Sequence, residues 1–145
     1  MTSSPSSGSA GGGPGAVERM GLAPGMIVME MGYDDDVDTQ FRDQVAELTG
    51  EDLVDDDSDE VVDVVLLWYR EDDGDLADTL VDAIAPLADD GVIWLVTPKR
   101  GRGGYVQPSD IAEAASVAGL SQTSIATIGN DWSGTRLVGR KSGKR

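Results

Sequence analysis

The sequence "VVDVVLLWY" (Val61–Tyr69) is the strongest apolar run in the chain. Its β-branched and aromatic residues favour a strand, and the scarcity of polar positions is typical of a strand covered on both faces. A second apolar run, Val92–Thr97, stops at Pro98 and predicts another buried strand. Trp68, Tyr69 and Trp94 lie within these runs, so we expect all three aromatic rings in the core.

Apolar residues recur at helical spacing after a shorter apolar run, Met26–Met31, which itself suits a buried strand. The stripe consists of Val37, Phe41, Val45 and Leu48. Residues three and four apart lie on one face of a helix, so the pattern predicts an amphipathic helix of about three and a half turns. Asp34 and Asp35 are candidate N-caps, and Gly50 is the expected left-handed stop.

Two further helices are predicted downstream. The apolar stripe of the first is Leu76, Leu80, Ile84 and Leu87. Pro86 should end this helix or sit in its last turn, because proline cannot donate the backbone hydrogen bond that a helix interior needs. The second helix is predicted in "PSDIAEAASVAGL", with Pro108 or Ser109 at its start and Gly119 as its C-terminal stop.

The last part of the chain predicts a hairpin. Ile125–Ile128 and Trp132–Val138 flank a tight "GND" turn, so the two strands should be antiparallel. We expect Trp132 to be partly exposed beside this turn, and Asp52–Val54 to form a further short strand. Strands that alternate with helices give a mostly parallel sheet. The expected fold is therefore α/β, a three-layer Rossmann-like sheet of five to six strands with an antiparallel C-terminal hairpin.

The composition divides the chain into three parts. Residues 1–18 are rich in Ser, Gly and Pro, and we expect a disordered arm because so little apolar surface cannot offset the entropy of ordering. Residues 19–141 should form a single Rossmann-like domain. Residues 142–145 are a basic tail. The start of the chain has neither the basic nor the apolar segment of a secretory signal, and with no cysteine present we expect a cytoplasmic location.

Charge and missing residue types restrict the function. The 145 residues include no histidine and no cysteine, which excludes a Ser-His-Asp triad, a cysteine nucleophile and imidazole- or thiolate-bound zinc. The net charge is −16, with 24 acids and 3 bases in residues 1–98. Such an acidic body should repel nucleic acid and anionic membrane surfaces. No catalytic residue set is recognisable.

The order of elements resembles the class I S-adenosylmethionine-dependent methyltransferase fold over about residues 21–141. "VMEMG" (Val28–Gly32) looks like the first strand of those enzymes with its terminal acid and first glycine. "VVDVVLLWY" looks like their central strand, and "LADDGVIWLVTPK" is similar to the turn and strand that follow. The resemblance implies S-adenosylmethionine as a cofactor, with Glu30, Gly32 and Tyr69 around it. The chain also resembles a small actinobacterial family known as a domain of unknown function, in which "GYDDD" and "TPKRGR" are recognisable.

Departures from the enzyme pattern point away from catalysis. Asp34 and Asp36 stand where the enzymes carry further glycines, and their side chains would intrude on the cofactor's space. The segment before Val61 is too short for the usual strand, helix and strand that carry the ribose-binding acid, which leaves Glu51 or Asp52 as its alternatives. "WYRED" (Trp68–Asp72) lacks the motif of amino-methylating enzymes.

Individual candidates have alternative interpretations. Glu30 could accept hydrogen bonds from a ribose hydroxyl or from backbone amides of the following turn. Asp34, Asp36 and Asp38 alternate as in a calcium-binding loop, but Thr39 and Val45 stand where such a loop has its glycine and glutamate. We therefore predict no calcium site, and a weak magnesium site among these aspartates stays open. Lys99, Arg100 and Arg102 could contact an anion or an acidic partner, or form a mobile surface loop whose bases pair with neighbouring acids.

These observations favour a non-catalytic regulatory or interaction protein on a degenerate methyltransferase-like scaffold, a pseudoenzyme without a cofactor. One alternative is an S-adenosylmethionine-dependent small-molecule methyltransferase. Another is a sensor of a phosphorylated ligand through the basic loop of residues 99–104. The expected partner is a protein or a small molecule rather than nucleic acid or membrane, and an exposed edge strand makes a homodimer conceivable.

Overall fold

The computed structural model describes residues 17, 20–129 and 131–139. Its elements are β1 (Val28–Met31), α2 (Thr39–Thr49), β2 (Val62–Trp68), α3 (Leu76–Ile84), β3 (Leu87–Pro98), α4 (Pro108–Val117), β4 (Leu120–Ile128) and β5 (Trp132–Gly139). The five strands form one sheet in the order β1-β2-β3-β5-β4. The first three strands pair in parallel, and β5 pairs antiparallel with both β3 and β4. The predicted α/β fold with an antiparallel C-terminal hairpin is thereby confirmed.

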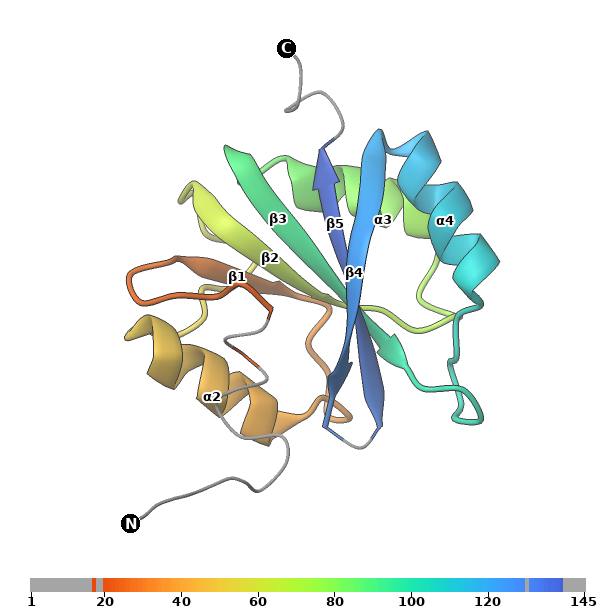
Figure 1. Cartoon of the computed structure of the whole chain (residues 1–145), viewed down its shortest axis with the longest axis horizontal. Helices are drawn as coiled ribbons and strands as arrows, with labels where there is room; N and C mark the ends of the chain where they lie inside the picture. The colour runs from red at the N-terminus through yellow and green to blue at the C-terminus, as the bar shows by residue number, and fades with distance from the viewer. Residues whose placement is uncertain (1–16, 18–19, 130, 140–145) are drawn as a thin grey trace.

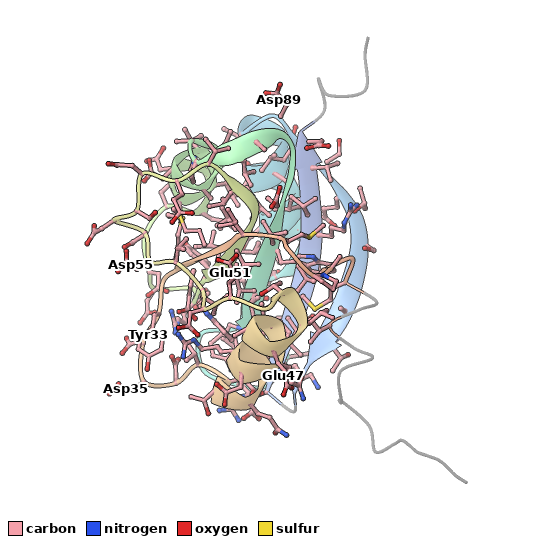
Figure 2. The ribbon with its side chains drawn as sticks, turned by 90° about the vertical axis from the view of Figure 1, so that its left-hand side faces the viewer. Tyr33, Asp35, Glu47, Glu51, Asp55 and Asp89 are labelled. Carbon is pink, nitrogen blue, oxygen red and sulfur yellow. The ribbon has the colours of Figure 1, made fainter. Side chains whose placement is uncertain are left out.

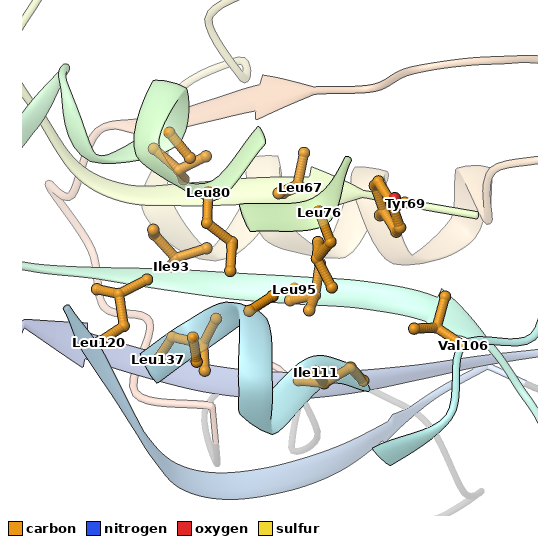
Figure 3. Packing of buried hydrophobic residues seen from close by; sticks show 14 of the residues in the cluster. Leu67, Tyr69, Leu76, Leu80, Ile93, Leu95, Val106, Ile111, Leu120 and Leu137 are labelled. Atoms are coloured by element: carbon orange, nitrogen blue, oxygen red, sulfur yellow. The ribbon is translucent and has the colours of Figure 1, made fainter. Parts of the chain in front are cut away.

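Helices cover both faces of the sheet (Figure 1). On one face, α2 and the segment before β1 bury an apolar cluster that contains Phe41, Trp68 and Trp94. On the other face, α3 and α4 pack on a cluster that includes Leu67, Tyr69 and the other residues labelled in Figure 3. Alternate residues of β2 point to opposite faces, which explains why this strand is apolar throughout.

Strand lengths differ from the expectation where pairing depends on distant residues. β3 begins at Leu87 rather than at Val92, because Leu87 pairs with Val62 across a register shift. Leu87 therefore belongs to a strand and not to the preceding helix, which ends at Ile84, before Pro86. The expected strand near Asp52 is reduced to one parallel bridge between Val54 and Met29.

The caps of α2 correct one prediction and confirm another. Asp38 is the N-cap, and its side chain accepts a 2.9 Å hydrogen bond from the Phe41 amide, so Asp34 and Asp35 are not the caps. The helix therefore begins later than its apolar stripe suggested. Gly50 ends it at φ 87°, in the left-handed region expected of it.

The described residues also test the boundaries and the tryptophans. Val17 is fully buried, although the sequence placed it in the disordered arm; the rest of that arm and the basic tail lie outside the described residues. Trp68 and Trp94 are buried as expected. Trp132 was expected to be partly exposed, but its indole is buried with its centroid 5.0 Å from that of Trp68 in an edge-to-face contact.

The surface carries the acids. Asp35, Glu47, Glu51, Asp55 and Asp89, which are labelled in Figure 2, are all exposed. Charges of like sign remain in water at little cost when they are spread over a surface in this way. No helix in the described part of the chain is long and apolar enough to cross a membrane.

Candidate functional site

The carboxyl ends of β1 and β2 approach each other closely at Gly32. A Cβ atom at this position would lie 2.1 Å from the backbone oxygen of Trp68, and Gly32 has a φ of 79°. Both observations require glycine, since a side chain would collide with backbone and L-residues rarely adopt this conformation. The packing of two adjacent strand ends therefore accounts for Gly32 without any ligand.

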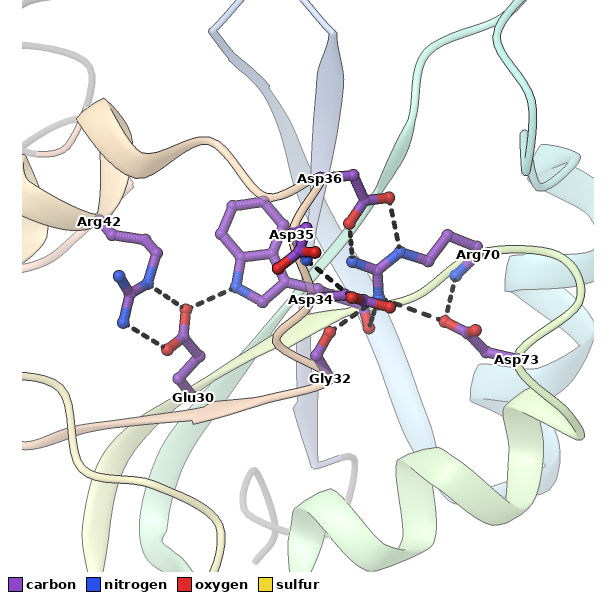
Figure 4. A network of polar contacts seen from close by, with 9 residues as sticks. Glu30, Gly32, Asp34, Asp35, Asp36, Arg42, Arg70 and Asp73 are labelled. Carbon is purple, nitrogen blue, oxygen red and sulfur yellow. Dashed lines mark hydrogen bonds and ion pairs between the residues drawn. The ribbon is translucent and has the colours of Figure 1, made fainter.

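The guanidinium of Arg70 occupies the space in front of these strand ends (Figure 4). Its Nη1 donates to the Gly32 carbonyl oxygen over 2.7 Å, and Nε donates to Asp36 Oδ2 over 3.1 Å. Nη2 forms an ion pair with the same aspartate, and Nη1 lies 3.3 Å from Asp73 Oδ2. Arg70 thus ties the loop after β1 to the loop after β2, and its side chain is only 11% exposed.

These contacts shift the ionisation of the pair. The hydrogen bond from Arg70 is the largest influence on Asp36 and lowers the pKa of its carboxyl. Burial alone would lower the pKa of Arg70, but its hydrogen bonds and charge interactions with Asp36 raise it overall. Asp36 and Arg70 are therefore both charged at neutral pH.

Glu30 is engaged on the α2 face of the sheet. Its carboxylate accepts hydrogen bonds from Arg42 Nε at 2.6 Å and Arg42 Nη2 at 2.8 Å, and from the indole Nε1 of Trp68 at 2.8 Å (Figure 4). Residue Glu30 is 8% exposed. The bidentate hydrogen bond with Glu30 is the largest influence on Arg42 and raises the pKa of its guanidinium. The backbone amides of the following turn are not among the hydrogen-bond partners of Glu30, which are the side chains of Arg42 and Trp68.

Tyr69 lies on the opposite face. Glu30 is in register with Leu66, which belongs to the cluster under α2, whereas Tyr69 belongs to the cluster under α3 and α4. The Tyr69 hydroxyl donates to the carbonyl oxygen of Gly74, and burial raises the pKa of this phenol. The structure therefore brings Glu30 and Gly32 near each other but turns Tyr69 away from both.

The three residues do not fit S-adenosylmethionine as they are arranged. The Glu30 carboxylate already accepts three hydrogen bonds from Arg42 and Trp68, the Gly32 carbonyl oxygen is bonded to Arg70, and the Tyr69 ring packs in a separate cluster. Among the described residues, no group of three or more acids is arranged to hold a metal ion, the aspartates after Gly32 included.

Sequence reasoning did not single out Arg42 and Arg70. A signal for them was present, since with Arg19 they are the 3 bases among residues 1–98. A lone base next to a buried strand in an acidic segment has many carboxylates within reach. Which carboxylate it contacts depends on the fold, because the Arg70 partners Gly32 and Asp36 precede it by 38 and 34 residues.

The basic loop lies after β3 and divides into different environments. Arg102 is paired with Asp131 at 3.1 Å, with both side chains about half exposed. Lys99 Nζ is 3.4 Å from the Gly129 carbonyl oxygen. Within the described residues Arg100 has neither an ion pair nor a hydrogen-bonded side chain. Lys99 and Arg100, but not Arg102, border a pocket of about 330 Å³.

Comparison with solved structures defines the class of fold. A S-adenosylmethionine-dependent methyltransferase from Aquifex aeolicus has a TM-score of 0.58 at 13% identity, covering 86% of this chain and 88% of its own. The cyclopropane synthase MmaA2 from Mycobacterium tuberculosis has a TM-score of 0.55 at 13% identity, covering 85% and 81%. Identities this low show the fold alone, and the chain has a methyltransferase-like fold.

Comparison of sequences identifies the family. The chain belongs to the family described as "Protein of unknown function (DUF3052)", whose profile matches residues 17–141. One relative is "Uncharacterized protein Rv2239c" of Mycobacterium tuberculosis, 54% identical over 129 residues, which is 88% of this chain and 81% of the relative. The resemblance drawn from "GYDDD" and "TPKRGR" is thus confirmed.

Proposed function

We propose that this chain is a non-catalytic regulatory or interaction protein built on a methyltransferase-like scaffold. The observation that carries the proposal is the Arg70 guanidinium, which stands where the carboxyl ends of β1 and β2 meet. Open α/β sheets bind ligands in the crevice outside those strand ends. An arginine side chain that is only 11% exposed, held by a carbonyl and two carboxylates, takes the place of a ligand there.

Two further features support the proposal. Twelve residues, Gly50–Val61, connect α2 to β2, and their pairing with the sheet consists of the single bridge at Val54. Among the described residues, β1 is therefore an edge strand of the sheet, and no further strand lies outside it to carry an acid that could bind a ribose. In addition, a chain without histidine or cysteine would depend on carboxylate, lysine or tyrosine as its general base. Tyr69 is turned away from the crevice and bonded to Gly74.

Calorimetric titration with S-adenosylmethionine and with S-adenosylhomocysteine tests the proposal. We expect no binding to the wild-type chain, and micromolar binding of either would overturn the proposal. The variant Arg70→Ala, which empties the crevice, and Arg102→Ala, which removes an exposed base elsewhere, form a matched pair. Binding gained by Arg70→Ala alone would identify the guanidinium as the group that excludes the nucleoside.

The methyltransferase alternative makes the opposite prediction for the wild-type chain. Substitution of Gly32 cannot separate the two functions, because any side chain there would collide with the Trp68 backbone whether or not a cofactor binds. Glu30→Gln is the informative variant. This substitution keeps the shape of the side chain. Under the methyltransferase alternative it should weaken cofactor affinity, whereas under the non-catalytic proposal neither the wild-type chain nor the variant binds the cofactor.

A ligand-sensing role through the loop Lys99–Gly104 is a second candidate. The observation that favours it is the pocket beside Lys99 and Arg100, which lies on the α4 side of the sheet and whose lining includes none of Gly32, Asp36, Arg70 and Asp73. Arg102 is not part of this pocket. The loop would then contribute two of its three bases to a ligand, and the third to its own stability through Asp131.

A further inference from the structure

The pocket beside the basic loop has a hydroxyl-lined floor. On the α4 face, Leu95 is opposite Thr135 and Thr97 is opposite Ser133 in the pairing of β3 with β5. Side chains of directly opposite residues project from the same face of a sheet. The floor therefore changes from leucine to three neighbouring hydroxyls, those of Thr97, Ser133 and Thr135, as the pairing approaches the carboxyl end of β3. All three line the pocket.

Two of these hydroxyls are buried without a protein partner. Thr97 is 4% exposed and Thr135 is 5% exposed, and no hydrogen bond of either side chain is present within the described residues. A third buried threonine behaves differently, since the Thr49 hydroxyl donates to the Val45 carbonyl oxygen at 3.0 Å. Buried polar groups normally have partners, and an unpaired one costs free energy. Two such hydroxyls facing one pocket point to a ligand.

The charge around the pocket selects an anion. Its lining has two bases, Lys99 and Arg100, and no acid, although the chain contains 27 acids. Three other pockets formed by described residues each include at least one aspartate. The first turn of α4 also borders the pocket through Pro108 and Ile111, and the N-cap of that helix, Gln107, makes no side-chain capping bond. A helix N-terminus favours negative charge.

We infer that this pocket binds the phosphate group of a small phosphomonoester. A phosphate group has three strong acceptor oxygens and a charge of about −1.5 to −2 at neutral pH, which three hydroxyl donors and two bases can match. Thr97 and Ser133 suit one phosphate, because opposite residues in an antiparallel pair have Cβ atoms about 4.5–5.5 Å apart. Val106 and Ile111, both labelled in Figure 3 and both part of the core on this face, supply an apolar wall for the rest of a small ligand.

This inference deepens the ligand-sensing role and concerns a different place from the Arg70 network. In it the bases of the loop are the rim of the site, and the selective groups are hydroxyls on β3 and β5. A peptide or an anionic surface that contacts only the exposed loop would not need the hydroxyls. The hydroxyls therefore decide between a small-molecule pocket and a general basic patch.

Amide chemical shifts of the full chain during titration provide the test. The probes are inorganic phosphate and glycerol 3-phosphate, with sodium chloride at matched ionic strength. We expect saturable shifts at Thr97, Ser133 and Thr135 with both phosphate probes and not with chloride. Tighter binding of glycerol 3-phosphate would identify a phosphomonoester rather than free phosphate as the ligand class. Shifts that chloride reproduces, or shifts confined to the loop, would overturn the inference.

Two variants with matched controls make the test specific. Arg100→Ala and Thr135→Val should each weaken phosphate binding about tenfold or more, because each removes a hydrogen bond to a charged group. Arg102→Ala and Thr49→Val should leave it unchanged. If Thr135→Val does not fold, Ser133→Ala takes its place. Binding that is insensitive to both hydroxyl variants would overturn the inference. Binding of S-adenosylmethionine is tested in a separate titration, so a failure of this inference can be told apart from a failure of the proposed function.

Discussion

The guanidinium of Arg70 donates a 2.7 Å hydrogen bond to the carbonyl oxygen of Gly32, and so joins the loop after β2 to the residue after β1. The same guanidinium lies 5.4 Å from the ring centroid of Trp132, at the start of β5. One side chain from the middle of the sheet thus contacts three separate segments. This arrangement makes Arg70 a structural residue at the position where related folds bind ligands.

Arg70→Met should lower the free energy of unfolding by about 1–3 kcal/mol, because it removes the hydrogen bonds that a largely shielded guanidinium donates to the Gly32 carbonyl and to two carboxylates. Urea denaturation measures the change. Arg102→Ala is the control, since its ion pair with Asp131 is exposed and should contribute less than about 1 kcal/mol. Equal losses in the two variants would mean that Arg70 contributes no more than a surface base.

Acid should weaken the Arg70 network through Asp36. The hydrogen bond from Arg70 lowers the pKa of the Asp36 carboxyl below its ordinary value of 3.8. A lowered folded-state pKa contributes stability that is present above the ordinary value and is lost as pH falls through the folded-state value. The stability difference between the wild-type chain and Asp36→Asn should therefore be constant above pH 3.8 and shrink below it. A difference that persists unchanged in strong acid would contradict the pairing.

Gly32→Ala should destabilise the chain far more than Gly50→Ala. Both glycines have positive φ, 79° and 87°, so each substitution incurs about 1–2 kcal/mol of backbone strain. A Cβ on Gly50 meets nothing within 4 Å, whereas one on Gly32 meets the Trp68 oxygen at 2.1 Å. The excess loss in Gly32→Ala, measured by thermal unfolding, isolates the close approach of β1 and β2. Similar losses would show that these strand ends can separate.

The local part of this fold was accessible from sequence, and the site was not. Apolar periodicity located α2 and its end at Gly50, because helix propensity and the left-handed stop depend on neighbouring residues. The N-cap was misplaced because several aspartates near the helix start have similar capping ability, and the actual cap depends on how the loop after β1 is held. Asp36, in that loop, is held by Arg70, 34 residues further along the chain.

Strand register explains why the expected cofactor residues do not converge. The sequence placed Glu30 near the end of one buried strand and Tyr69 at the end of another, but it determined neither their pairing nor their faces. The pairing of Glu30 with Leu66 turns the carboxylate toward α2, and alternation along β2 turns Tyr69 toward α3. A shift of one residue in register would reverse the side of the sheet to which each group points.

Glu30 and Arg42 should behave as a coupled pair in stability. Glu30→Gln and Arg42→Met should each destabilise the chain, because each variant leaves the charge of the other side chain without its partner. The loss in Glu30→Gln should be the smaller one, because the Arg42 side chain is 28% exposed and can partly turn to solvent, whereas that of Glu30 is 7% exposed. The double variant should lose less than the sum of the two, with an interaction energy of about 0.5–3 kcal/mol. Urea denaturation of the four proteins measures it. Additive losses would indicate that Glu30 is held by Trp68 and not by Arg42.

The hydroxyl of Thr135 should contribute no stability to the ligand-free chain. Thr135→Val replaces a buried hydroxyl, which has no partner among the described residues, with a methyl group of similar size, so the free energy of unfolding should be unchanged or higher. Thr49→Val is the control, because it removes the hydrogen bond to Val45 and should cost about 0.5–1.5 kcal/mol. The comparison requires phosphate-free buffer. A loss in Thr135→Val as large as that in Thr49→Val would mean that the protein itself satisfies this hydroxyl in solution.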